Sequence, residues 1–205
     1  MKFDPRSFTC GVLIAIGVGV LAFMALGGHG AMSMQMEAST STGVLPAGTF
    51  DSKHVGLHFD YPAGYAQALN HINEGQEDEY HQVVFVKGQQ LAQTDAVWEG
   101  PPAITIAGID VPADTNLEYW VMHDKRSNWS MAYPAYAEGD FDKTTVGGEP
   151  ALSFNYEGQY TAKAVVVLHK GRMYVFAVSW VAQEDQIRQD FENIIHTVKF
   201  IDEAN

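Results

Sequence analysis

The chain opens with an uninterrupted apolar stretch. Residues 7–28 contain no charged side chain, and Lys2 and Arg6 precede them. A run of about 20 apolar residues is enough for a helix to cross the hydrocarbon core of a bilayer, so this pattern predicts a transmembrane helix. Because the basic residues lie before the span, we expect them to stay in the cytoplasm and the rest of the chain to be exported.

The length of this stretch distinguishes a retained anchor from a removable signal peptide. Signal-peptide cores are usually about 7–15 apolar residues long, so the longer run here favours an uncleaved signal anchor. Small residues follow at Gly30 and Ala31, and cleavage near Ala31 with secretion of the product is the alternative. Cys10, the only cysteine, lies inside the apolar run. The exported part therefore has no disulfide and must be stable through its core.

The hydropathy pattern divides the chain into three regions. We expect a cytoplasmic tip and transmembrane signal anchor over residues 1–28, a flexible stalk rich in Met, Ser and Thr over 29–48, and an extracytoplasmic domain over 49–205. The last region is long enough for one hydrophobic core and too short for two ordinary domains.

Strand-like patterns fill most of the predicted domain. Val55, Leu57, Phe59 and Tyr61 alternate with polar residues, which predicts a half-buried strand over residues 54–61. Runs rich in aromatic and β-branched residues predict further strands at 68–73, 80–87 and 103–109, and an antiparallel meander at 150–156, 160–168 and 173–181.

Two helices are expected among these strands. The first would begin after Asp114, which can cap it, and would end near Arg126. It would place Leu117, Trp120 and Val121 on one face. The second is indicated by apolar residues at helical spacing close to the C-terminus, and it should lie across the sheet. Its apolar positions are Ile187, Phe191, Ile194, Ile195 and Val198.

The order of these elements resembles the PsbP-like family. The resemblance runs from Phe50 to Ile201 and rests on an FDYP opening strand, a TVGGEPALSFNY entry into the meander, an HKGRMYVFAVSW strand and a closing helix that ends in TVKFI. It implies an α+β fold, in which helices cover an antiparallel sheet in an α/β/α sandwich. The family includes an extrinsic subunit of photosystem II and bacterial exported proteins, and its members are mostly binding or assembly factors.

The charge of the chain narrows the classes of partner. The formal net charge is −13 at pH 7, and such a surface repels phosphate backbones, which need clustered Lys and Arg. Nucleic-acid binding is therefore excluded. The expected partners are the membrane, through the N-terminal helix, and an envelope or membrane protein complex.

The stalk contains a cluster that suits a soft metal ion. His29 is followed by Met32, Met34 and Met36, and thioethers beside an imidazole are suitable ligands for Cu(I) outside the cytoplasm. The alternative is that these methionines are simply flexible apolar residues.

A second metal candidate lies in the predicted strand 54–61. His58 and Asp60 would share its polar face and could bind Zn(II) or Mn(II) with a further ligand. His54 would lie about 13 Å from His58 on an extended strand, too far to share one ion. The alternative is an ordinary exposed polar face.

The sequence contains no recognised catalytic motif. We find no G-x-S-x-G, no H-E-x-x-H and no Gly-rich phosphate loop. The predicted function is therefore a membrane-anchored, extracytoplasmic, non-catalytic binding or assembly module. A copper-binding protein that uses the stalk is the alternative, and an enzyme of unknown class is the third.

Overall fold

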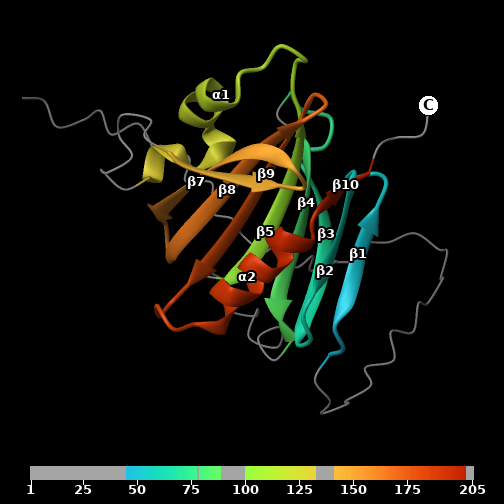
Figure 1. The fold of residues 1–205 in the computed structure, drawn as a ribbon, viewed down its shortest axis with the longest axis vertical. Helices are drawn as coiled ribbons and strands as arrows, with labels where there is room; N and C mark the ends of the chain where they lie inside the picture. The colour runs from blue at the N-terminus through green and yellow to red at the C-terminus, as the bar shows by residue number, and fades with distance from the viewer. Residues whose placement is uncertain (1–44, 78, 89–99, 133–140, 202–205) are drawn as a thin grey trace, which may run out of the picture.

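The computed structural model describes residues 45–77, 79–88, 100–132 and 141–201. Figure 1 shows their arrangement. In chain order the elements are β1 (Gly48–Ser52), β2 (Leu57–Tyr61), β3 (Tyr65–Ile72), β4 (Tyr80–Lys87), β5 (Ala103–Asp110), α1 (Leu117–His123), the 3-10 helices η2 (Lys125–Ser127) and η3 (Trp129–Met131), β6 (Asp142–Val146), β7 (Glu149–Glu157), β8 (Thr161–His169), β9 (Arg172–Trp180), α2 (Gln186–Thr197) and β10 (Lys199–Phe200).

Seven of these strands form one antiparallel sheet in the order β3-β4-β5-β9-β8-β7-β6. The expected meander is present as the neighbouring strands β7, β8 and β9. Lys170 and Gly171 join β8 to β9 with φ angles of 46° and 79°, which is the geometry of a two-residue type I′ hairpin turn. Gly147 and Gly148 join β6 to β7 with φ angles of 58° and 88°, so the β6–β7 hairpin uses the same kind of turn.

A second sheet, which the sequence analysis did not predict, contains β1, β2 and β10. The strand expected over residues 54–61 begins only at Leu57, so the prediction was wrong for its first three residues. Residues 53–56 instead form a turn in which Gly56 has a φ of 78°. A Cβ at this position would lie 2.6 Å from the Tyr174 hydroxyl oxygen, so the turn requires glycine both for its conformation and for space.

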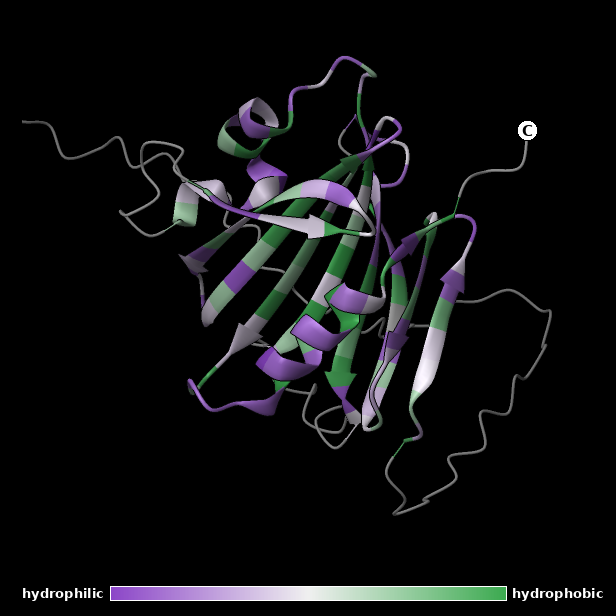
Figure 2. Ribbon diagram, in the orientation of Figure 1, coloured by the Kyte–Doolittle hydropathy of each residue, from purple (hydrophilic) through white to green (hydrophobic). Residues whose placement is uncertain are grey.

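Helices cover the two faces of the large sheet, as Figure 1 shows. On one face, α2 packs mainly against β2, β9 and β5 and shares a core with the small sheet. On the other face, α1 and η3 cover a second core over β7 and β8. The α+β class is confirmed, and Figure 2 shows α2 with apolar residues toward the sheet and polar residues outward.

The helices agree with the predicted faces but not with every predicted boundary. Trp120 and Val121 are buried, as expected. However, the cap of α1 is Asn116, whose side-chain oxygen accepts a hydrogen bond from the Tyr119 backbone at 2.8 Å, and Asp114 lies outside the helix. The helix also ends at His123, earlier than expected, because the chain continues into η2.

The predicted apolar stripe of α2 is buried in the core. Ile187, Phe191, Ile194 and Ile195 are all buried. Asp190 is an unexpected member of the same buried face, with 7% exposure. The predicted helix is therefore confirmed, but a hydropathy pattern alone would have placed Asp190 in water.

The expected transmembrane helix and most of the stalk fall within residues 1–44, outside the described residues. In the described part of the chain, no helix has the length and apolar content needed to cross a bilayer.

Candidate functional site

A groove of about 560 Å³ lies beside α2. It exists because α2 lies over β9 and β5 and does not extend over the β6–β8 half of the same sheet face. Figure 1 shows this half of the sheet extending past α2. Most of the strand residues that line it are polar, with Val165, Val178 and Trp180 as the apolar members.

The floor of the groove comes from alternate residues of four neighbouring strands, β6 to β9. In β7, Ser153 and Asn155 face the groove, whereas Phe154 and Tyr156 belong to the core on the opposite face. Asp142 of β6 lies opposite Ser153, and Lys163 of β8 lies opposite Asn155. The strand register therefore brings hydroxyl, amide, carboxylate and ammonium groups together in a short polar row.

Residues of α2 and of the loop before it form the wall. The Lys163 ammonium lies 2.7 Å from the Glu192 carboxylate, which joins the floor to the helix. The Arg188 guanidinium carbon lies 4.7 Å from the centre of the Trp180 ring, a cation–π contact, and Arg188 also donates to the backbone oxygen of Gln183. The wall is therefore held in place by contacts to both the sheet and the loop.

The charges around the groove are mainly negative. Hydrogen bonds from the backbone amides of Ala182 and Val181 hold the pKa of the Asp185 carboxyl below its ordinary value, so this group stays ionised at neutral pH. The lining contains four carboxylates and two basic groups: Asp142, Glu184, Asp185 and Glu192 against Lys163 and Arg188. A ligand with positive charge would complement this surface.

A buried carboxylate fixes the position of α2 and so the width of the groove. Asp190 accepts hydrogen bonds from the Tyr65 hydroxyl at 2.7 Å and from the Gln186 amide at 3.1 Å, and its carboxylate lies 3.6 Å from the Lys87 ammonium. Burial, and then the Asp190 carboxylate, raise the pKa of Tyr65. These contacts link α2 to β3 and β4, which lie at the opposite edge of the sheet from β6.

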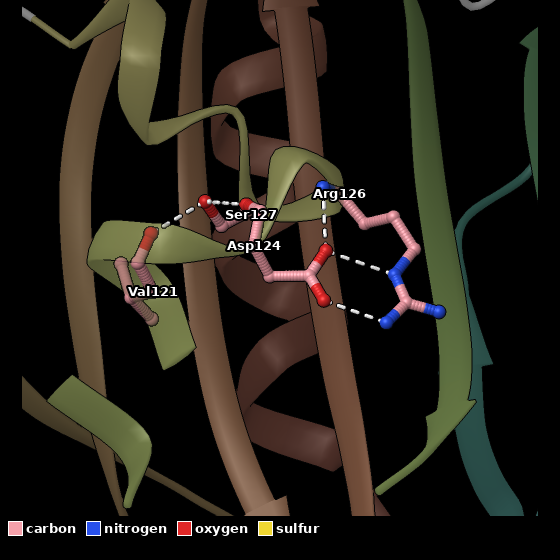
Figure 3. Close-up of polar contacts among 4 residues, drawn as sticks. All are labelled: Val121, Asp124, Arg126 and Ser127. Carbon is pink, nitrogen blue, oxygen red and sulfur yellow. Dashed lines mark hydrogen bonds and ion pairs between the residues drawn. The ribbon is translucent and has the colours of Figure 1, made fainter. Parts of the chain in front are cut away.

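A second cavity of about 460 Å³ lies where β4 and β5 approach α1. Figure 3 shows part of its wall. The Asp124 carboxylate receives a bidentate pair of hydrogen bonds from Arg126, at 2.9 Å and 2.6 Å. The buried Ser127 hydroxyl donates to the Val121 backbone oxygen at 2.6 Å. These contacts hold η2 against the end of α1.

The predicted metal-binding pair lies on β2, but each of its side chains contacts β1. His58 Nδ1 lies 2.9 Å from the Asp51 carboxylate, and Asp60 accepts a hydrogen bond from the Thr49 hydroxyl at 2.7 Å. No three His, Cys, Asp or Glu side chains in the described residues are grouped so as to hold a metal ion. The other predicted ligands, His29, Met32, Met34 and Met36, lie outside the described residues.

Sequence reasoning missed the groove residues, although one signal was present. The run Ala151–Tyr156 places small or polar residues at every second position of an otherwise apolar strand, which indicates one open face. No comparable pattern in the sequence indicated where β6 begins and ends, or where α2 would cross the sheet.

Comparisons with known proteins concern the fold. No protein-family model matches the chain, and no curated protein matches it. The chain is similar to the solution structure of cyanobacterial PsbP (CyanoP) from Synechocystis sp. PCC 6803, with 14% sequence identity and a TM-score of 0.48. The match covers 80% of this chain and 98% of that chain. It agrees with the PsbP-like resemblance of the sequence and is a similarity of fold alone.

Proposed function

We propose that this protein is a membrane-anchored binding module that holds an extended, positively charged segment of a partner protein in the groove beside α2. The observation that supports this most is the groove itself, which has a volume of about 560 Å³ and is lined mostly by polar side chains. Its excess of carboxylates favours a segment that contains Lys or Arg.

The strand at the rim of the groove suits an extended partner. β6 is the last strand of the seven-stranded sheet, and its Asp142 and Thr144 line the groove. The outer edge of a terminal strand offers backbone N–H and C=O groups to an added strand. A segment paired with this edge would make backbone hydrogen bonds to β6, and its Lys or Arg side chains would extend across Asp142 and Thr144 into the groove.

The proposed location follows from the N-terminal sequence. The apolar run of residues 7–28 would anchor the protein by a single span, and its basic flank would place the domain on the extracytoplasmic side. The partner would then be a component of an envelope or membrane protein complex.

Photo-crosslinking in native membranes tests the groove. A photoreactive amino acid at position 144 of the full-length protein should give one dominant adduct, and the same probe at Tyr119, which is 62% exposed on α1, should not give it. Asn155→Arg should abolish the adduct because it adds bulk and positive charge to the floor. The matched control is Asn193→Arg, on an exposed position of α2 outside the groove, which should leave the adduct unchanged.

The crosslinked segment of the partner must also have the expected charge and conformation. The crosslinked segment, mapped by mass spectrometry, should be extended and rich in Lys or Arg. Equal adducts from positions 144 and 119, or an adduct that survives Asn155→Arg, would show that the groove is not the binding surface.

A further inference from the structure

Three histidines from separate parts of the chain meet at one end of the sheet, away from the groove. His71 of β3 and His81 of β4 lie directly opposite each other, with stacked rings whose centres are 4.4 Å apart and whose planes are inclined by 25°. His54, in the turn before β2, completes the cluster: its Nε2 lies 3.3 Å from His81 Nδ1.

The fold holds His54 in this position through its backbone. The Arg172 guanidinium donates to the His54 backbone oxygen at 2.9 Å and pairs with Asp110 at 2.6 Å. The Tyr174 hydroxyl donates to the neighbouring Val55 oxygen at 3.0 Å. Both side chains come from β9, so the turn is fixed to the large sheet and the imidazole of His54 is directed at that of His81.

The distance between the two nitrogens matches that between ligands of a tetrahedral metal ion. Zn²⁺ binds imidazole nitrogen at about 2.0–2.1 Å, so two nitrogens on one tetrahedral ion lie roughly 3.3–3.4 Å apart. The His54–His81 pair is at 3.3 Å. A metal ion could therefore bridge the two rings with little movement of the backbone.

Carboxylates lie close to the histidine pair. His81 lines the 460 Å³ cavity, whose wall includes the carboxylates of Glu77, Glu79 and Asp110. Asp110 is paired with Arg172, so Glu77 and Glu79 are the groups that attract a cation here.

We propose that His54 Nε2 and His81 Nδ1 bind one divalent ion of the Zn²⁺ class. Each ring would keep its proton on the nitrogen away from the metal, so that the direct contact between the rings is replaced by two metal–nitrogen bonds. The described residues include no third ligand already in place. The exposed Glu79, whose carboxylate lies 3.7 Å from His71 Nε2, would reach the ion by side-chain rotation, and water would complete the tetrahedron.

Calorimetric titration of the untagged full-length protein with Zn²⁺ tests this site. His54→Ala and His81→Ala should each weaken the binding by about tenfold or more, since loss of even a residue that only supports a metal ligand costs this much. His196→Ala removes an exposed histidine on α2 and is the matched control, which should bind as the unmodified protein does. Co²⁺ in place of Zn²⁺ should give the strong visible absorption of a tetrahedral site.

Further variants separate this site from other metal-binding residues. His58→Ala should not affect Zn²⁺ binding; if it alone abolishes binding, the ion is held on β2 and the proposal is wrong. Equal affinity for the unmodified protein and the His54→Ala variant would also overturn it. Urea midpoints in EDTA show whether each variant is folded. If His81→Ala does not fold, His54→Ala decides the question, because His54 lies in an exposed turn. The test is independent of the groove.

Discussion

Truncation of Phe191 tests how α2 packs on the sheet. Phe191 is completely buried, with 0% exposure, in the core that α2 shares with the two sheets. Phe191→Ala removes the ring and leaves a cavity, for which a loss of about 3–5 kcal/mol in the free energy of unfolding is typical. We expect the neighbouring strands to collapse little into this cavity, because β9 is paired on both of its sides, with β5 and β8.

Urea unfolding followed by tryptophan fluorescence measures this loss. The matched control is Gln189→Ala on the exposed side of α2, which should change the free energy of unfolding by no more than about 0.5 kcal/mol. A natural domain of this size is stable by about 5–15 kcal/mol, so the Phe191→Ala midpoint should fall far below that of the control. Equal midpoints for the two variants would refute the packing of α2 described above.

Three further predictions concern other parts of the chain. Tyr65→Phe removes the hydroxyl that donates to buried Asp190 and should lower the free energy of unfolding by about 1.5–3 kcal/mol, the usual range for a hydrogen bond to a charged group; an unchanged urea midpoint would contradict it. The pKa of His81 is below its ordinary value of 6.5 in the folded state, so just below pH 6.5 the unfolded chain binds more protons than the folded chain. The free energy of unfolding should therefore decrease as the pH falls through this range. With EDTA present, the His81→Asn variant should show a smaller decrease. The mature protein should keep residues 7–28 and stay in the membrane fraction, whereas mass spectrometry of a soluble product that begins near Met32 would establish cleavage.

Much of the fold could be read from local patterns. Alternation at every second residue depends only on neighbours along the chain, so β4, β5 and the β7–β9 meander agree with prediction to within a residue or two. The apolar spacing of α2 was equally clear. β1, β6 and β10 were missed because short strands with exposed residues have too few apolar positions to produce a period; in β6, only Val146 is buried.

The candidate sites could not be read in the same way, because each depends on which strands become neighbours. The groove exists only where α2 leaves part of a sheet face uncovered, and no local pattern states where a helix will cross a sheet. The alternating pattern relates His54 only to His58, because it predicts one continuous strand through both residues. Its actual neighbour, His81, lies 27 residues away in the chain.

The amino-acid order alone determined the acidic charge, the apolar N-terminal run and the alternation that produces a two-sided sheet, since these are properties of composition and of nearest neighbours. Only the tertiary structure decided that Asp190 is buried against Tyr65, which is 125 residues distant, and that Arg172 and Tyr174 of β9 hold the turn bearing His54. Burial and proximity across such distances arise from the packing of whole elements, and local periodicity contains no information about them.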